Sequence, residues 1–236
     1  MVTTPQAPLP RRVFITGSTG YLGSRLIKGL LARGYGVQAL ARSRDAAKRL
    51  PVECKIILGN ALDSKSFADH VRPASTFVHL VGVAHPAPWK TRKFRNVDLV
   101  STRASIAAAQ AADIAHFVYV SVAQPAPVMK TYIQTRAECE GFLRSSGLHS
   151  TILRPWYVIG PGHWWPVCLL PLYSLMKRFS ATKDIALRLG LVTHKQMTSA
   201  LLWAIEHPVQ GLRIMDVRHI RRASMPASNS TTSGAP

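Results

Sequence analysis

A glycine-rich turn near the start of the 236-residue chain constrains its fold more than any other feature. The apolar run Val13-Phe14-Ile15 leads directly into Thr16-Gly-Ser-Thr-Gly-Tyr-Leu-Gly23. Apolar residues then recur at helical spacing, and a second apolar run follows at residues 37–40. The order of strand, glycine turn, helix and strand predicts the first unit of a Rossmann-type dinucleotide-binding fold.

Each glycine of this turn has a distinct expected role. Gly17 permits the tight turn, Gly20 lets the backbone approach a pyrophosphate, and Gly23 lets the helix pack close to the sheet. The phosphates would meet the positive end of the helix dipole. The less favoured alternative is a glycine-rich turn that binds no ligand.

The residues after the second strand predict which dinucleotide is preferred. An NAD site usually has an acidic residue there, which holds the ribose hydroxyls. This chain has Arg42, Ser43 and Arg44, and no acid before Asp45. Because a guanidinium pairs with a 2′-phosphate through two parallel hydrogen bonds, Arg42 favours NADP(H) over NAD(H), with Ser43 and Arg44 as helpers. The alternative is that these arginines are merely exposed loop residues.

Further apolar segments extend the same alternating pattern. Strands are expected at residues 55–58, 77–82, 117–121 and 214–217, and helices at 97–112 and 198–207. This alternation predicts an α/β fold with a doubly wound parallel sheet and right-handed crossovers. We expect a flexible N-terminus at 1–10, one NAD(P)-binding domain at 11–222 with a small α/β cap from about residue 160, and a disordered tail at 223–236.

Net charge and cysteine content bear on the cellular compartment and on the kinds of partner that we expect. The 30 basic and 11 acidic residues give a net charge of +19, which fits a basic cytoplasmic protein, with a polyanionic partner or an anionic membrane surface as alternatives. Cys54, Cys139 and Cys168 are widely spaced, which indicates reduced thiols and no metal site. The chain has no secretory signal pattern and no membrane-spanning apolar run. We therefore expect a cytoplasmic protein, with peripheral membrane contact as the alternative.

Seven segments together resemble the short-chain dehydrogenase/reductase superfamily, in its extended and atypical branches. The resemblance is strongest to the NAD(P)H-binding group that includes NmrA-like proteins and the complex I accessory subunit, and it extends to epimerases and dehydratases. The matching segments occur in the family's order over roughly residues 12–165. They are TGSTGYLG at 16–23, GNALD at 59–63, HLVG at 79–82, NVDLVSTRASIAAAQ at 96–110, FVYVSV at 117–122, YIQTRAE at 132–138 and TILRPWYVIGPG at 151–162.

The resemblance implies a set of cofactor-binding residues. The pyrophosphate is expected to lie along Thr16, Gly17, Ser18, Thr19, Gly20, Tyr21, Leu22 and Gly23, and the 2′-phosphate beside Arg42. The adenine is expected beside Asn60 and Ala61, and the linking phosphate and ribose beside Leu80, Val81 and Gly82. The nicotinamide ribose is expected to face Tyr132 and Arg136, and Pro155 completes the set. The family usually has Asp at the position of Asn60, which weakens or alters that contact.

The catalytic residues depart from the family pattern. Active members combine a serine or threonine, a tyrosine that transfers a proton, and a lysine that lowers the tyrosine pKa. Tyr132 matches the tyrosine, but Arg136 replaces the lysine and Ala123 falls at the serine position, with Ser121 two residues early. Arg136 keeps the positive charge but is bulkier and planar. We predict a degenerate set that faces the cofactor without efficient turnover, with an active proton-transfer pair or a plain surface pair as alternatives.

Several functions remain open from the sequence. An active enzyme would reduce a small apolar carbonyl or quinone with NADPH, because residues 159–179 suggest an apolar lid, and Tyr157 replaces the Asn typical of nucleotide-sugar enzymes. Membrane contact and core packing are alternatives for that segment, in which His163 is expected to be structural. A non-catalytic NADPH sensor or scaffold is the first alternative function. Nucleic-acid binding by the Trp89-Lys-Thr-Arg-Lys-Phe-Arg95 segment is the less favoured second one.

Overall fold

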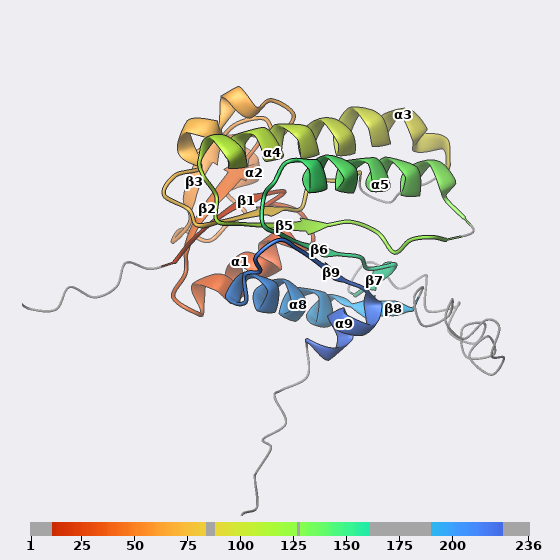
Figure 1. Ribbon diagram of the computed structural model, residues 1–236. Coiled ribbons are helices and arrows are strands. Elements are labelled where there is room, and N and C mark those ends of the chain that lie inside the picture. The colour runs from red at the N-terminus through yellow and green to blue at the C-terminus, as the bar shows by residue number, and fades with distance from the viewer. Residues whose placement is uncertain (1–10, 84–87, 127, 161–189, 224–236) are drawn as a thin grey trace, which may run out of the picture.

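A seven-stranded parallel sheet forms the centre of the molecule, as expected (Figure 1). The computed structural model describes residues 11–83, 88–126, 128–160 and 190–223. The strand order is β3-β2-β1-β4-β5-β6-β9, the Rossmann order with one strand added. The bounds are Arg12–Thr16 for β1, Gly36–Ala41 for β2, Lys55–Leu58 for β3, Thr76–His79 for β4, His116–Val120 for β5, Ser150–Leu153 for β6 and Leu212–Met215 for β9.

Helices cover both faces of this sheet. One face carries α1 (Gly23–Leu31), α8 (His194–Glu206) and α9 (Val217–Arg222) (Figure 1). The other carries α3 (Thr91–Lys93), a π-helical segment η4 (Phe94–Leu99), α4 (Val100–Ala111) and α5 (Lys130–Ser145). The short elements are α2 (Arg44–Ala47), the 3-10 turns η1 (Ser64–Ser66), η2 (Ala68–His70) and η3 (Pro88–Lys90), and a parallel pair of strands, β7 (Tyr157–Ile159) and β8 (Leu191–Thr193).

Alternation along β1 divides the core between the two faces. Val13 and Ile15 are buried with the apolar residues of α1 and α8, whereas Phe14 is buried in the opposite layer. In that layer the Phe14 and Phe77 rings lie 5.1 Å apart, and Phe117 stacks on Phe77 at 5.1 Å. Burial on both faces explains why the strands read as continuous apolar runs.

Three element boundaries differ from the sequence-based ones. Residues 80–82 lie beyond β4, and the last strand lies two residues earlier than expected. Helix α8 begins at His194 because Thr193 and Gln196 form a capping box that satisfies two backbone N–H groups. The expected N-terminus at 1–10, the expected tail at 223–236 apart from Ala223, and most of the lid segment with His163 and Cys168 lie outside the described residues. Ala223 itself is the C-cap of α9.

None of the helices in the described ranges has the length and apolar composition needed to cross a bilayer. In the same ranges, no group of three histidine, cysteine or acidic side chains lies close enough to hold a metal ion. Cys54 and Cys139 are both buried free thiols.

Candidate functional site

The glycine turn between β1 and α1 has a backbone shape that excludes side chains. Gly17 has a φ of +72°, and a methyl carbon added there would lie 2.7 Å from the carbonyl carbon of Leu80. A methyl carbon at Gly23 would collide with the Gly17 oxygen, because the helix starts directly against the turn. The Gly20 N–H donates to the same oxygen at 3.0 Å. The backbone of the turn therefore lies so close to the segment after β4 that no side chain fits between them at Gly17.

The N-terminus of α1 is suited to an anion. The helix has nine residues, no side chain caps its first turn, and that turn contains no acidic residue. Backbone N–H groups and the positive end of the helix dipole therefore point toward the exposed Gly20 side of the turn. Together with the cradle at Gly17 and Gly23, this geometry fits a dinucleotide pyrophosphate.

Two hydroxyl side chains of the turn point inward. The Ser18 hydroxyl donates to the Leu40 carbonyl at 2.6 Å, and Thr16 Oγ1 lies 2.8 Å from His79 Nδ1. Both residues are fully buried, so only their backbone is available to a ligand. Thr19, Tyr21 and Leu22 are half-buried.

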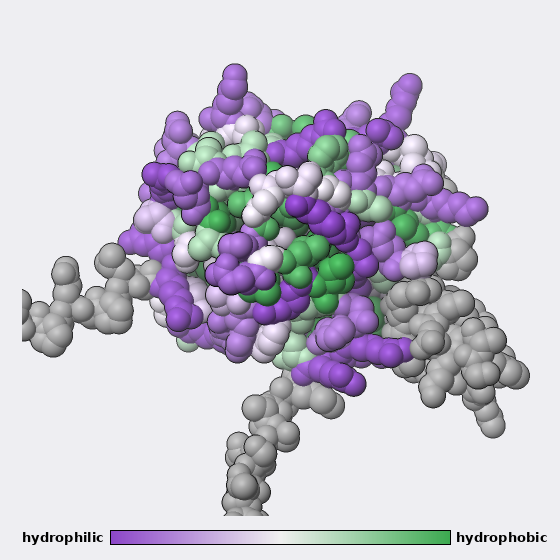
Figure 2. All heavy atoms as spheres, viewed as in Figure 1, coloured by the Kyte–Doolittle hydropathy of each residue, from purple (hydrophilic) through white to green (hydrophobic). Residues whose placement is uncertain are grey.

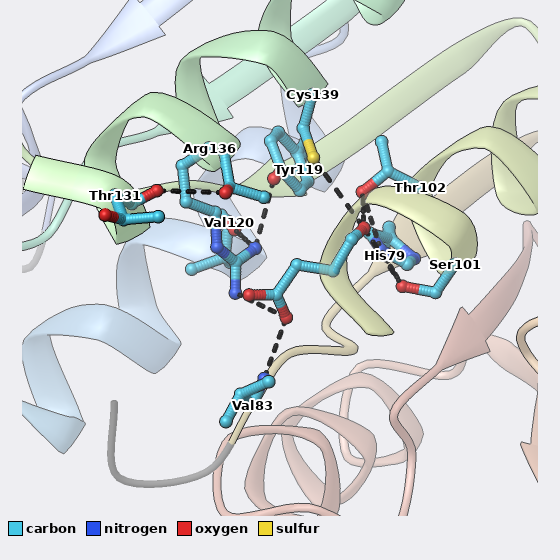
Figure 3. Close-up of polar contacts among 11 residues, drawn as sticks. His79, Val83, Ser101, Thr102, Tyr119, Val120, Thr131, Arg136 and Cys139 are labelled. Carbon is cyan, nitrogen blue, oxygen red and sulfur yellow. Dashed lines mark hydrogen bonds and ion pairs between the residues drawn. The ribbon is translucent and has the colours of Figure 1, made fainter. Parts of the chain in front are cut away.

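His79 lies at the centre of a buried hydroxyl cluster beneath this turn. Ser105 Oγ lies 2.9 Å from its Nδ1. Thr102 Oγ1 and Ser101 Oγ lie 3.3 and 3.5 Å from its Nε2 (Figure 3). Burial, with a smaller contribution from the Arg136 charge, lowers the pKa of His79 to about 3. The ring is therefore neutral at physiological pH, and it joins the ends of β1 and β4 to α4.

The expected adenosine end of the site is exposed. Arg42 follows β2 directly and forms no hydrogen bond or ion pair with the described part of the chain. Ser43 is occupied as the N-cap of α2, since its Oγ accepts from the Ala46 N–H at 3.2 Å, and the Asp45 carboxylate is paired with Lys48 at 2.9 Å. Arg42 is thus available for an anionic ligand, while Ser43 is engaged in local structure.

Asn60 and Ala61 follow β3 at the same edge of the sheet. The Asn60 Oδ1 accepts from the Leu62 N–H at 3.1 Å, and its own N–H donates to the Ser66 hydroxyl at 2.9 Å. Its side chain therefore shapes the turn after β3, and Ala61 lies half-buried beside it.

Tyr132 lies in the first turn of α5, beside the π-helical segment. Its ring packs against Phe94 with the centroids 4.9 Å apart. The two rings, together with Met129, Lys130 and Thr131, line a hollow of about 130 Å³. Tyr132 thus borders a small surface hollow of mixed polarity.

Arg136 lies one helical turn after Tyr132 but is buried (Figure 3). Its Nη1 donates to the Tyr119 hydroxyl at 3.0 Å and to the Val120 carbonyl at 3.2 Å. Its Nη2 lies 3.6 Å from Asp98 Oδ1, and a methyl carbon at Gly82 would collide with it. The guanidinium therefore contacts the segment at 80–82, where the resemblance places the cofactor ribose.

Asp98 is a buried partner that the sequence analysis missed. It comes from the π-helical segment, and its Oδ1 accepts from the Val83 N–H at 2.8 Å. Burial raises the pKa of its carboxyl, and the Arg136 charge and the Val83 N–H only partly offset that effect. Asp98 Oδ2 and Arg136 Nε have no hydrogen-bond partner among the described residues. A π-helical turn of this kind is often found at functional sites.

The Asp98–Arg136 pair determines the environment of the Tyr132 hydroxyl. Burial raises the pKa of Tyr132, the Arg136 charge lowers it, and the Asp98 carboxylate raises it again, with a net increase. For Arg136 itself, burial alone would lower the pKa, but Tyr119, Tyr132 and Asp98 outweigh burial and raise it. Tyr132 therefore stays protonated at neutral pH, mainly because burial outweighs the Arg136 charge, and the Asp98 carboxylate adds a smaller effect in the same direction as burial.

The expected serine position lies at the end of β5. Ala123 is buried there, and its N–H donates to the Pro155 carbonyl at 2.8 Å. The Ser121 hydroxyl is buried and has no hydrogen-bond partner in the described part of the chain. Pro155 thus joins the chain after β6 to the chain after β5 through its backbone.

Glu140 is a second buried acid that the sequence analysis missed. Its carboxylate accepts from Arg154 Nε at 2.9 Å, from Arg144 at 2.9 Å and from the Gln124 amide at 2.7 Å. It thereby fixes α5 to the chain after β5 and the chain after β6. The spacing of Glu140 and Arg144 at i and i+4 was the only sequence signal for this network.

A family model described as NAD(P)H-binding matches residues 17–160. A ketoreductase from Stigmatella aurantiaca, named for 4-hydroxy-2-methyl-3-oxo-4-farnesyl-3,4-dihydroquinoline-1-oxide, is 26% identical over 63% of this chain and 51% of its own length. The ceramide reductase of Caulobacter vibrioides is 27% identical over 87% of this chain and 65% of its own length. The chain thus spans about half to two thirds of the length of these relatives.

Solved structures agree with the fold. The Bordetella bronchiseptica enzyme WbmH, in complex with NAD+, superimposes with a TM-score of 0.65 at 20% identity, over 87% of this chain and 75% of that one. Because the family model covers more than half of the chain, and the glycine turn has the geometry that such a match requires, the protein belongs to the NAD(P)H-binding family.

Proposed function

We propose that the protein is an NADPH-dependent reductase acting on a small apolar carbonyl or quinone. The observation that supports this most is the position of Tyr132. It lines a hollow, and Arg136, one turn further along the same helix, contacts Gly82. A proton donor and the segment expected to pass beside the linking phosphate and ribose of the cofactor therefore lie on adjoining parts of the molecule.

The preference for NADPH depends on Arg42. It is exposed after β2, no acidic side chain precedes Asp45, and Asp45 is paired with Lys48. A ribose 2′-phosphate would gain charge-assisted hydrogen bonds from this guanidinium, whereas a 2′-hydroxyl would find no carboxylate.

The raised pKa of Tyr132 keeps the phenol protonated at neutral pH and also makes it a weaker acid than an ordinary tyrosine. When bound, NADPH supplies the hydride for the carbonyl carbon. The Tyr132 phenol donates its proton to the carbonyl oxygen, and the tyrosinate left behind takes a proton from water. Alcohol oxidation needs tyrosinate as a base at the start, and the Asp98 carboxylate opposes its formation.

The relatives support the choice of substrate class. The two reductases named above act, by their names, on a farnesylated quinoline oxide and on ceramide, which are both large apolar molecules. They support an apolar substrate, whereas the small size proposed for it rests on the hollow at Tyr132, which has a volume of about 130 Å³.

A second candidate function is a non-catalytic NADPH sensor. The observation that favours it is the same Asp98–Arg136 pair at 3.6 Å, because the Asp98 carboxylate partly offsets the positive charge that would activate Tyr132. No hydroxyl side chain occupies the Ala123 position to orient a substrate oxygen. A sensor would bind NADPH and leave it unoxidised with every carbonyl and quinone offered.

Fluorescence titration with NADPH and NADH is the first test. We expect energy transfer from tryptophan to NADPH with clearly tighter binding than to NADH. Arg42→Ala should weaken NADPH binding by roughly 10- to 100-fold and leave NADH binding unchanged, because the lost charged hydrogen bonds are worth about 1.5–3 kcal/mol. Arg49→Ala, an exposed arginine beyond α2, is the matched control. Equal affinity for both cofactors would disprove the preference.

Turnover distinguishes the reductase from the sensor. Single-turnover oxidation of bound NADPH is followed with apolar ketones and quinones, and Tyr132→Phe is compared with Tyr35→Phe, a half-buried tyrosine that follows α1. Loss of oxidation only in Tyr132→Phe supports the reductase. Tight NADPH binding without oxidation in the unmodified protein supports the sensor.

A further inference from the structure

One end of the molecule combines an exposed tryptophan with a concentration of positive charge. Trp89 is 83% exposed, and it begins a segment with exposed Arg92, Lys93 and Arg95. Figure 2 shows long hydrophilic side chains projecting from the corner where Figure 1 draws α3. Neither the segment from Trp89 to Val97 nor that from Val128 to Thr131 contains an acidic residue.

The start of α5 continues this surface. Phe94 and Tyr132 are in ring contact, and Arg95 lies 3.7 Å from Glu138 of α5, so the two segments lie side by side. Val128, 52% exposed, and the exposed Lys130 come from this second segment. We call Trp89, Arg92, Lys93, Arg95, Val128 and Lys130 the Trp89 patch.

We propose that the Trp89 patch docks on an anionic lipid surface. An exposed indole with surrounding cations is the combination that binds at a bilayer interface, since the ring enters the headgroup region and the cations attract acidic lipids. Val128 adds apolar area. Charge complementarity is the argument for this occupant, because the patch carries cations without a compensating exposed carboxylate other than Glu138.

The composition of the patch favours lipid over nucleic acid. Single-stranded nucleic acid is bound by successive bases stacking on several aromatic rings along a basic groove. Among the large hydrophobic side chains that the structure describes as exposed, Trp89 is the only aromatic one. One ring surrounded by cations suits insertion at an interface better than base stacking.

The patch lies beside the site of the proposed function. The functional meaning of membrane docking, though not the docking itself, rests on that proposed function. The hollow at Tyr132 adjoins the patch, because Lys130 of the patch is one of its lining residues. A protein docked by this end would present Tyr132 to an apolar molecule held in the bilayer. A basic surface placed elsewhere would give the protein membrane affinity but not this orientation.

Vesicle flotation without cofactor is the test, so that its outcome is independent of NADPH binding and turnover. We expect the full chain to float with phosphatidylcholine vesicles that contain phosphatidylserine, to stay unbound with phosphatidylcholine alone, and to dissociate at high salt. Arg92→Gln/Lys93→Gln/Arg95→Gln should weaken binding roughly 100-fold, at about 5-fold for each charge removed. Trp89→Ala should weaken it further and should abolish quenching of tryptophan fluorescence by brominated lipid.

The matched control removes the same charge from the other end of the sheet. Arg49→Gln/Lys55→Gln/Lys65→Gln neutralises three exposed cations around α2 and β3, and Val52→Ala removes an apolar side chain that is 96% exposed. Equal loss of flotation in this control would show that net charge alone binds the vesicles, and would overturn the proposal. Failure of the unmodified protein to float, with patch-dependent retardation of single-stranded DNA in its place, would overturn it in favour of nucleic acid.

Discussion

The guanidinium of Arg136 lies 3.6 Å from the buried carboxylate of Asp98. Arg136 belongs to α5, the helix that carries Tyr132, and its guanidinium also contacts Gly82. The arginine was expected to face the nicotinamide ribose. Its Nη1 donates to the Tyr119 hydroxyl and the Val120 carbonyl, and its Nη2 lies beside the Asp98 carboxylate. At the position where the resemblance would place a lysine, this chain has Arg136, and the buried Asp98 carboxylate lies beside it.

Asp98→Asn should lower the pKa of Tyr132, because the variant removes the negative charge that opposes tyrosinate and keeps Arg136. The measurement is an ultraviolet difference titration of tyrosinate, in which the Tyr132→Phe form of each protein is subtracted. Stability should fall by about 3 kcal/mol, since a buried guanidinium loses its charged partner. Asp69→Asn, an exposed acid on η2, is the control. An unchanged Tyr132 pKa in Asp98→Asn would show that Asp98 has only a structural role.

Glu140→Gln should destabilise the protein strongly. Its carboxylate is fully buried and holds Arg154, Arg144 and Gln124, so its loss leaves buried charge uncompensated at a cost of about 3–5 kcal/mol. Glu138→Gln, two residues earlier on α5, removes a half-exposed acid 3.7 Å from Arg95 and should cost less than about 1 kcal/mol. Urea unfolding of both variants tests this difference, and similar losses would contradict it.

The fold was predictable because its signals are local. The glycine turn, the apolar runs of β1 and β5, and the helical spacing in α1 each lie within a few residues of one another. The Asp98–Arg136 pair was not predictable, because it joins residues far apart in sequence whose contact depends on how a π-helical segment packs against α5. The inward orientation of Thr16 and Ser18 has a similar cause, since it depends on His79 and Leu40 from neighbouring strands.

Gly17→Ala should abolish cofactor binding and destabilise the fold. Alanine at a φ of +72° is strained by about 1–2 kcal/mol, and its methyl carbon would meet the Leu80 backbone at 2.7 Å. Gly34→Ala separates the two effects, because Gly34 has a φ of +75° but no atom within 4 Å of the added carbon. Calorimetry should show a loss of about 1–2 kcal/mol for Gly34→Ala with NADPH binding intact. A Gly17→Ala protein that binds NADPH normally would refute the close approach at this turn.

Two buried histidines should make stability fall in mild acid. Burial lowers the pKa of His79 from 6.5 to about 3, and burial with Arg213 and His149 lowers that of His116 from 6.5 to about 4. Both rings are neutral in the folded protein, so the unfolded chain binds more protons below pH 6.5. Their stabilisation is complete above that pH and is lost as the pH falls toward the folded values.

At pH 5 these two histidines should therefore take up about two protons when the protein unfolds. The free energy of unfolding should then change by about 2.7 kcal/mol per pH unit. Urea unfolding at a series of pH values gives this slope. His79→Gln should reduce it by about one proton, whereas His70→Gln, at an exposed position of η2, should leave it unchanged. An equal slope in His79→Gln and the unmodified protein would mean that His79 is already protonated in the fold, and that the hydroxyls around it act as acceptors for an imidazolium.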